Sequence, residues 1–267
     1  MKIVYINVAS RTDRRDFMEG QLQALGLSAE RIEAVTPADL TREQIDRYCD
    51  ASRGAFLMPL ELCCGLSHLR ALRSVLVSGA DRAIILEDDA VLSSRLPAFL
   101  QDFEQLSLAC DLLRLETTFE RTRLLASQMP ACGGIAIQIP YSWASGSGAY
   151  LISRRGAQLA VASEELLRKP ADRAMCNPYE PIPRRLGLKQ VNPALAVQAD
   201  RSPGAPRLPS DIGNSRGDGM RLERQYFWRR RPHAIAEWIN RDIVIAAQKA
   251  WHEHVRGARK QVIAFLP

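Results

Sequence analysis

The residues best suited to chemistry stand together at Glu87-Asp88-Asp89. An apolar run, 83–86, precedes these three acids, and a second, 90–92, follows them. A short apolar run bounded by polar residues is typical of a strand buried on both faces of a sheet. Three adjacent carboxylates repel one another unless a cation lies among them. The triplet is therefore either a cation site or a solvated acidic turn, and the local pattern fits both.

The spacing of the acids predicts which of them can bind the same metal ion. On an extended chain Glu87 and Asp89 point to one side, and Asp88 points to the other. Two hard oxygen ligands on one side suit magnesium or manganese, and a divalent ion suits a diphosphate. Ligands of open α/β sheets bind beyond the carboxyl ends of the strands, where these acids are expected. Glu87 and Asp89 are thus the predicted metal ligands.

The elements that must position the acids alternate between strands and helices. This alternation of strands and helices predicts an α/β fold with a largely parallel sheet. Gly133-Gly134, between two apolar runs, predicts a hairpin. Strands are expected at 2–8, 31–35, 83–86, 111–115, 149–152 and 191–198, and helices at 12–25, from 41, at 62–76, at 97–106 and from about 156.

Length and charge indicate one main unit with an appendage. The 267 residues suffice for a catalytic domain at 1–200 and an extension at 201–267 that comprises a loop and a basic helix. The formal charge is +6, but 201–267 holds 13 Lys and Arg against 6 Asp and Glu, so residues 1–200 are close to neutral. Nucleic-acid binding by the main body is therefore not indicated.

Cysteine usage and hydropathy predict a cytoplasmic protein. No apolar run approaches the roughly 18 residues of a membrane span, and the N-terminal run is too short for a signal peptide. The six cysteines form no Cys-x-x-Cys pair, and no His-rich spacing suggests zinc. We therefore expect reduced, mostly buried thiols.

Two common nucleotide-binding classes are excluded by missing motifs. No Gly-x-x-x-x-Gly-Lys-Ser/Thr loop accompanies the acidic strand, and no Gly-x-Gly-x-x-Gly follows the first strand. What remains is the acidic motif of sugar-nucleotide transferases, in which a metal bridges protein carboxylates and the diphosphate of the donor.

Seven short segments in order carry a resemblance to glycosyltransferase family 25, the lipooligosaccharide and lipopolysaccharide sugar transferases with collagen galactosyltransferase relatives. The resemblance implies a GT-A nucleotide-sugar-binding fold, a metal-dependent reaction and usually a UDP-galactose donor. The cofactor we expect is a divalent metal, manganese. One departure is that Val8, Ala9 and Ser10 replace the Leu, acid and Arg common in the first loop of the family. The segments are 6–7 with 11–15, 61–69, 85–90, 111–115, 148–157, 170–172 and 193–198.

Six residues form the predicted donor site. Asn7 ends the first strand, where its amide can bind uracil, although a turn Asn fits the pattern equally. Arg11 and Arg14 can neutralise a diphosphate, since arginines are otherwise unfavourable at a helix N-terminus. The resemblance implies substrate contact for Ser67 and His68, against a core histidine as the alternative. The sixth member of the set is Asp88.

Asp172 is the predicted catalytic base. An inverting transferase needs a carboxylate to take the proton of the acceptor hydroxyl, and in the family this acid recurs near the acceptor side. The alternative is a helix N-cap. The sequence does not show which residue is the third metal ligand. The candidates are Gln198, Asp200, Asp211 and His233.

The predicted function is metal-dependent, inverting transfer of a sugar onto a saccharide acceptor such as lipooligosaccharide. The donor is expected to be UDP-galactose, with another UDP-sugar, or a non-catalytic nucleotide-sugar- or carbohydrate-binding protein of the same fold, as alternatives. Arg229-Arg230-Arg231 and the aromatics of the extension suit either an anionic membrane surface presenting a lipid-linked acceptor or a helix packed on the domain.

Overall fold

A nine-stranded sheet forms the centre of the fold in the computed structural model, which describes residues 1–53, 55, 57–106, 109–126, 129–202, 204–206, 208 and 239–267. The strand order is β12-β7-β8-β10-β5-β9-β3-β1-β2. Its strands are β1 (Lys2–Asn7), β2 (Glu30–Glu33), β3 (Arg82–Glu87), β5 (Leu112–Arg114), β7 (Arg121–Ala126), β8 (Ala136–Pro140), β9 (Ala149–Ser153), β10 (Lys189–Asn192) and β12 (Arg259–Val262).

The sheet is mixed, with a parallel set around β1. Strands β2, β1 and β3 are mutually parallel, and β5 is parallel to β10. Strand β9 lies between β3 and β5 and runs antiparallel to both, so β3 and β5 share one direction. The α/β class predicted from the alternation is confirmed, while the reversed β9 and the antiparallel β7–β8 hairpin make the sheet less parallel than expected.

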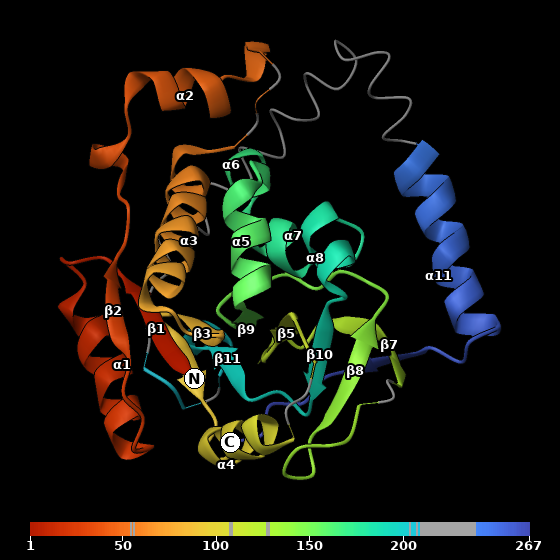
Figure 1. Ribbon diagram of the computed structural model, residues 1–267. Helices are drawn as coiled ribbons and strands as arrows, with labels where there is room; N and C mark the ends of the chain where they lie inside the picture. The colour runs from red at the N-terminus through yellow and green to blue at the C-terminus, as the bar shows by residue number, and fades with distance from the viewer. Residues whose placement is uncertain are drawn as a thin grey trace.

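Helices cover both faces of the sheet (Figure 1). On β1, Ile3 and Tyr5 pack in one apolar cluster with α1 and α4, whereas Val4 and Ile6 pack in a second with α3, α5 and α7. Burial on both faces explains why the strands read as nearly continuous apolar runs. The helices are α1 (Thr12–Ala24), α2 (Arg42–Tyr48), α3 (Pro59–Ser78), α4 (Leu96–Gln105), α5 (Arg154–Ala162), α6 (Glu165–Arg168), α7 (Ala171–Cys176), α8 (Pro181–Leu186) and α11 (Ile245–His254).

A small second sheet lies beside the acidic turn. It consists of β4 (Ala90–Leu92), β11 (Ala196–Gln198) and β6 (Glu116–Thr117), in the order β4-β11-β6. The single strand predicted at 191–198 is therefore wrong, since β10 and β11 belong to different sheets. Pro193 lies between them, and it has no N–H with which to continue the β10 ladder. The second sheet places Gln198 opposite Ala90, next to the acids.

The extension contributes to the main sheet. Strand β12 pairs antiparallel with β7 at the sheet edge, and the backbones of Ala194 and Leu266 hydrogen-bond to each other. Helix α11 follows a π-helical turn, Ile239–Val244, and stands to one side of the sheet (Figure 1). The basic cluster 229–231, together with Tyr226, Phe227, Trp228 and Trp238, lies outside the described residues.

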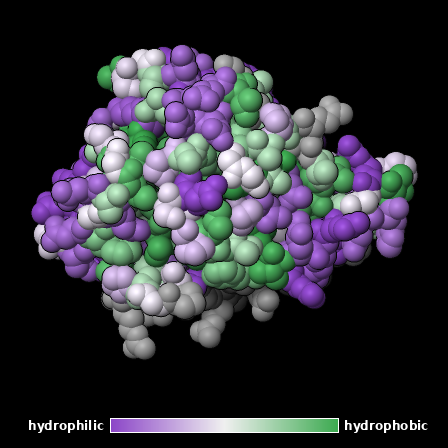
Figure 2. Space-filling view, turned by 90° about the horizontal axis from the view of Figure 1, so that it is seen from below, coloured by the Kyte–Doolittle hydropathy of each residue, from purple (hydrophilic) through white to green (hydrophobic). Residues whose placement is uncertain are grey.

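Among the described residues, six of the eleven exposed large apolar side chains lie in 239–262. The face of the molecule seen from below mixes hydrophilic and hydrophobic residues without a continuous apolar band (Figure 2). Within the described part of the chain, no helix combines the length and hydropathy needed to span a bilayer. Four of the six free cysteines are buried, in agreement with the expected mostly buried thiols.

Candidate active site

A cavity of about 450 Å³ opens where β1 and β3 end. It is walled by the 34–37 loop, α3, the turn after β3, the 146–147 loop, the start of α7 and the segment after β11. The structure brings all nine predicted site residues to this cavity. They are Asn7, Arg11, Arg14, Ser67, His68, Glu87, Asp88, Asp89 and Asp172.

Acidic side chains outnumber basic ones in the cavity wall. Among the described residues, six carboxylates face three arginines there. An anionic diphosphate entering such a site meets net repulsion unless a cation accompanies it. The carboxylates belong to Glu61, Glu87, Asp88, Asp89, Asp172 and Asp200, and the arginines are Arg11, Arg14 and Arg201.

Asp88 is a buried acid held by β1 and α1. Its Oδ2 accepts a hydrogen bond of 2.7 Å from Asn7 Nδ2, and its Oδ1 lies 2.8 Å from Arg14 Nη1. Burial raises the pKa of Asp88, while the Arg14 charge and the Asn7 hydrogen bond oppose the rise. The Asn7 amide also donates to the Arg11 carbonyl oxygen at 3.1 Å. Asn7 and Arg14 thus fix the acidic turn to the first strand and helix.

Asp89 lines the cavity and has one unsatisfied side-chain oxygen. Its Oδ2 lies 3.2 Å from Arg14 Nη1, whereas its Oδ1 is buried and has no hydrogen-bond partner among the described residues. Burial, then the negative charge of Glu87, raises the pKa of Asp89 to about 7. A buried carboxylate oxygen without a donor, among other acids, fits a hard divalent cation. The residues present at this position therefore suit the metal expected from the sequence.

Glu87 points toward α3. Its Oε1 lies 3.3 Å from His68 Nε2 and accepts a hydrogen bond of 2.9 Å from Ser147 Oγ. The expected alternation, with Asp88 opposite the other two acids, does not hold: Asp88 and Asp89 contact the same guanidinium nitrogen. The reason is that β3 ends at Glu87, and the chain turns through the two aspartates before β4 begins.

Helix α3 supplies one wall of the cavity. Ser67 Oγ accepts from the Val35 backbone N–H at 2.8 Å and donates to the Cys63 carbonyl at 2.7 Å, which holds the 34–37 loop against the helix. His68 is fully buried, and its Nδ1 lies 3.0 Å from the Tyr150 hydroxyl. Both side chains line the cavity, and both also have structural partners.

Asp172 lies in the first turn of α7 with only 3% of its surface exposed. Its Oδ2 accepts from the Gly146 backbone N–H at 3.2 Å, and its Oδ1 accepts from the Arg173 N–H at 2.8 Å. The N-cap of α7 is Pro170, so Asp172 does not occupy the capping position weighed as its alternative role. The carboxylate is held at the cavity wall by backbone donors.

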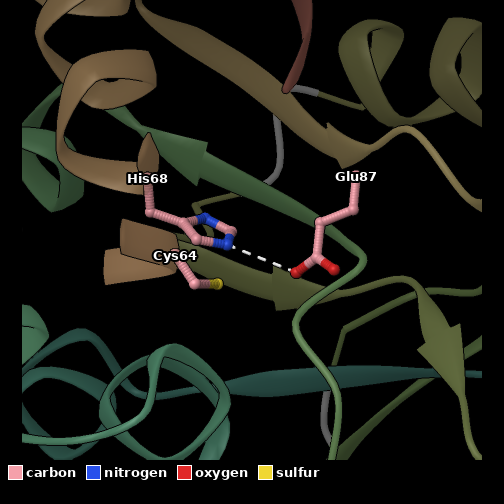
Figure 3. Close-up of side chains that lie close together, drawn as sticks. All are labelled: Cys64, His68 and Glu87. Atoms are coloured by element: carbon pink, nitrogen blue, oxygen red, sulfur yellow. Dashed lines mark hydrogen bonds and ion pairs between the residues drawn. The ribbon is translucent and has the colours of Figure 1, made fainter. Parts of the chain in front are cut away.

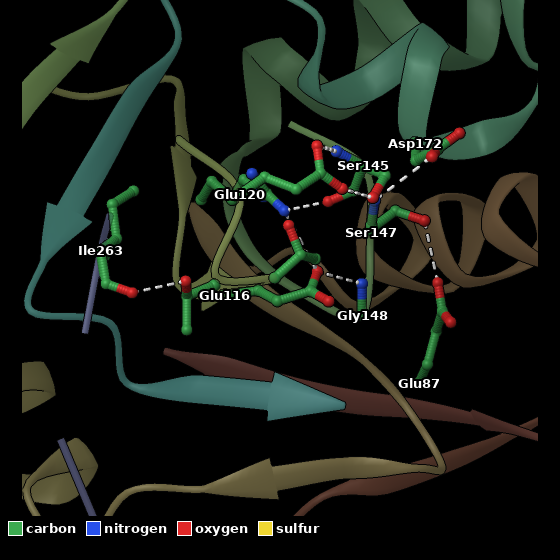
Figure 4. Close-up of polar contacts among 12 residues, drawn as sticks. Glu87, Glu116, Glu120, Ser145, Ser147, Gly148, Asp172 and Ile263 are labelled. Atoms are coloured by element: carbon green, nitrogen blue, oxygen red, sulfur yellow. Dashed lines mark hydrogen bonds and ion pairs between the residues drawn. The ribbon is translucent and has the colours of Figure 1, made fainter. Parts of the chain in front are cut away.

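The 145–148 loop connects Asp172, Glu87 and a third acid, Glu116 (Figure 4). The Gly148 N–H donates to Glu116 Oε2 at 2.8 Å, and Gly148 O accepts from the Glu87 N–H at 2.8 Å. Gly146 has φ 95°, and a Cβ there would lie 2.6 Å from Glu116 Oε1. Glycine is therefore required where the loop passes over Glu116.

The sequence left the third metal ligand open among four residues. Gln198 and Asp200 line the cavity, whereas Asp211 and His233 lie outside the described residues. Sequence reasoning passed over Cys64, which also lines the cavity. Its signal was available as the Cys64–His68 spacing of four residues on one helix, which places both side chains on the same face.

Comparisons with known proteins identify the family of the chain. A sequence profile described as glycosyltransferase family 25 (LPS biosynthesis protein) matches residues 1–175, so the chain belongs to glycosyltransferase family 25. The lacto-N-neotetraose biosynthesis glycosyltransferase LgtB of Neisseria gonorrhoeae is 27% identical over 241 residues, which cover 85% of each chain.

Relatives from animals match a shorter region. Procollagen galactosyltransferase 1 of Danio rerio is 26% identical over 178 residues, which cover 62% of this chain and 29% of the relative. The human inactive glycosyltransferase 25 family member 3 is 27% identical over 179 residues, with the same coverage. A crystal structure of a glycosyltransferase involved in glycosylation of the major capsid of PBCV-1 aligns with TM-score 0.44 and 10% identity, over 83% of this chain and 98% of that one.

Proposed function

We propose that this protein transfers galactose from UDP-galactose to a saccharide acceptor, with inversion and with manganese bound in a GT-A-type site. The excess of carboxylates over arginines in the cavity carries the proposal, because a cation is needed before a UDP-sugar can enter. The name of the Danio rerio relative, a galactosyltransferase, favours galactose as the transferred sugar. The name of LgtB favours a glycan as acceptor.

The unsatisfied oxygen of Asp89 supports its role as a metal ligand, with Glu87 as the second ligand and Gln198 or Asp200 as a third. A bound manganese ion would offset the charge of the UDP leaving group. Arg11 lines the cavity, which supports contact with the diphosphate as its role, and Arg14 keeps Asp88 and Asp89 in position. Asn7, Ser67 and His68 shape the wall against which the donor lies.

Asp172 is the proposed base. It accepts the proton of the acceptor hydroxyl as that oxygen bonds to the anomeric carbon, and UDP leaves with the electron pair of the broken bond. The Gly146 and Arg173 N–H groups hold the carboxylate in one orientation, so it need not reorganise before attack.

The test is the linkage between metal and donor. UDP affinity is measured by calorimetry with manganese and with chelator, for the unmodified protein and for Asp89→Ala. We expect manganese to strengthen UDP binding at least tenfold in the unmodified protein and to have no effect in Asp89→Ala. A variant that binds UDP with unchanged metal dependence contradicts the assignment of Asp89.

The alternative function is that of a non-catalytic binding protein of the same fold. The name of the human relative, an inactive family member, supports this alternative. Release of UDP from UDP-galactose in the presence of manganese separates the two functions. A parallel series with UDP-glucose and UDP-N-acetylhexosamines identifies the donor. Tight donor binding without release of UDP, with or without acceptor, would establish the alternative function.

A lipid-linked acceptor at the inner face of the membrane is a further part of the proposal. Trp251 of α11 is 58% exposed and Ile243 of the preceding turn 51% exposed, as suits contact with a bilayer surface. However, α11 is also fixed to the sheet by an Arg123–Glu253 ion pair of 2.8 Å. Co-sedimentation with anionic and neutral vesicles tests this point, and a protein that stays in the supernatant at low salt does not dock.

A further inference from the structure

Three side chains of different chemistry converge beside the acidic turn. Cys64 and His68 project from α3, and Glu87 ends β3 opposite them (Figure 3). The Cys64 sulfur, a His68 ring nitrogen and a Glu87 carboxylate oxygen lie within 4.8 Å of one another. Thiolate, imidazole and carboxylate are the three ligand types that zinc takes in proteins.

The distance between His68 and Glu87 in this cluster matches that of two ligands of one ion. Bonds to zinc of about 2.0–2.3 Å in a tetrahedron place neighbouring ligand atoms roughly 3.3–3.8 Å apart. His68 Nε2 and Glu87 Oε1 are 3.3 Å apart, which is long for a hydrogen bond but suits two ligands of one ion. Little movement of these two groups is needed to admit the metal.

A second layer of contacts orients both groups. The Tyr150 hydroxyl lies 3.0 Å from His68 Nδ1, which leaves Nε2 facing Glu87 and Cys64. Ser147 Oγ donates to Glu87 Oε1 at 2.9 Å. Histidine ligands of metals usually donate their other ring N–H to an oxygen, and such partners fix the ring and raise its basicity.

We propose that Cys64, His68 and Glu87 form a zinc site whose fourth position opens to the cavity. All three residues line the cavity, so an ion can reach them from solvent. Sulfur and nitrogen ligands favour zinc over manganese, whereas the oxygen atoms around Asp89 favour manganese. The cavity therefore offers two neighbouring positions for cations of different chemistry.

Zinc binding moves protons in a defined way. The Cys64 thiol loses its proton to solvent and binds as thiolate, and the Glu87 carboxylate binds ionised. His68 binds as the neutral ring through Nε2, with its proton on Nδ1 and donated to the Tyr150 oxygen. Each zinc ion therefore releases one proton, that of the Cys64 thiol.

The zinc site has a consequence that rests on the proposed function. Glu87 belongs to both sets of ligands, so zinc withdraws it from manganese. Zinc should then weaken manganese-dependent UDP binding, and thus act as an inhibitor whose target is Cys64 rather than the donor.

The experiment titrates the full chain with zinc, without UDP or manganese, by calorimetry in buffers of different ionisation enthalpy. We expect one zinc per chain and one proton released. Cobalt serves as a second probe, because a thiolate ligand gives it a charge-transfer band. Cys64→Ser should lower zinc affinity about a hundredfold and abolish the band, while Cys49→Ser, a change at a half-buried cysteine outside the cluster, should do neither.

Equal zinc affinity in Cys64→Ser and the unmodified protein, or no stoichiometric binding in the unmodified protein, overturns the zinc site. Circular dichroism verifies that each variant is folded, and His68→Gln gives an independent variant if Cys64→Ser is not. Failure here is distinguishable from failure of the proposed function. Asp89→Ala should keep zinc affinity, and Cys64→Ser should keep manganese-dependent UDP binding.

Discussion

Asp89 and Glu116 are both acids with a raised pKa and one buried side-chain oxygen that lacks a hydrogen-bond partner among the described residues. Burial, the largest cause for each, raises the pKa of Asp89 to about 7 and that of Glu116 to about 8. Their surroundings differ. Asp89 lines the cavity, whereas Glu116 lies behind the 145–148 loop, with its Oε2 bound to the Gly148 N–H.

The difference between these surroundings shows that a carboxyl group with a raised pKa identifies a functional site only when a ligand can reach it. Perturbed pKa values accompany catalytic residues, but structural networks produce them as well. At Asp89 the missing partner can be an ion that enters from the cavity. At Glu116 the space above the carboxyl is filled by Gly146, so the acid is expected to remain protonated and to support the loop.

The largest effect is expected from the matched pair Asp89→Asn and Glu116→Gln, each of which removes one ionisable group. Asp89→Asn should lower turnover about a thousandfold, because stabilisation of the leaving group by the metal is lost. Glu116→Gln should change turnover at pH 7 less than about threefold, since the amide resembles the protonated acid. UDP release at saturating manganese measures both. Similar losses in the two variants would erase the distinction between the regions.

Asp172→Asn is next in size. The amide keeps the shape of the side chain but cannot accept the acceptor proton, so turnover should fall about a hundredfold or more. UDP affinity should stay within about twofold, because Asp172 is assigned to the acceptor side. Steady-state kinetics and UDP titration measure the two quantities. Turnover close to that of the unmodified protein would move the search to another carboxylate that lines the cavity, and Asp200 would be tested first.

Gly146→Ala tests whether the enclosed region supports the cavity. The new Cβ would approach Glu116 Oε1, and φ 95° is unfavourable for alanine, so the unfolding free energy should fall by about 1–3 kcal/mol. Turnover should fall about tenfold, because the Gly146 N–H that orients Asp172 shifts. Gly134→Ala is the matched control: its φ is 80°, but nothing lies within 4 Å of the Cβ. A turnover loss in both variants would point to general destabilisation.

The smallest effect is a pH dependence of stability. The pKa of Glu116 is raised from 4.5 to about 8, so in this window the folded state keeps a proton that the unfolded state has lost. The unfolding free energy should therefore fall as pH rises from about 4.5 to about 8, and Glu116→Gln should remove that part of the slope. Asp89 gives the same sign between pH 3.8 and about 7.

Addition of manganese should separate the contribution of Asp89 to the pH dependence of stability from that of Glu116. Because the proposed ion would bind ionised Asp89, it should reduce only the part of the slope that Asp89→Asn also removes. Chemical denaturation across this pH range, with and without manganese, provides the measurement. A slope that manganese abolishes entirely would place Glu116 within reach of the cavity.

Periodicity predicted the individual elements well. The helix expected from 41 is α2, which follows a Thr41–Gln44 capping box. The helix expected at 62–76 lies within α3, which ends at Ser78 with the left-handed Gly79 as its C-cap. The Gly133-Gly134 turn joins Cys132 and Ile135, as the hairpin prediction required. These features depend on neighbouring residues, whose local preferences are readable from the sequence.

Features that depend on distant residues were not predictable in this way. The sequence of β9 does not reveal that it runs antiparallel between β3 and β5, since pairing depends on the whole sheet. The nine site residues share a cavity as the family motifs implied, but the alternation rule failed at Asp88 because the strand ended one residue earlier. Pro193, which separates β10 from β11, was a local signal within a run interpreted as a single strand.

The backbone N–H groups of Gly146 and Gly148 have a consequence for hydrogen exchange. Each is held by a carboxylate that is almost or fully buried, Asp172 for Gly146 and Glu116 for Gly148. Amide hydrogens bonded in this way exchange with solvent only when the local structure opens. Gly146 and Gly148, two glycines separated by one residue, would exchange within the shortest labelling times in an exposed loop. Here they become slow-exchanging sites that report separately on the cavity wall and on the interior behind it.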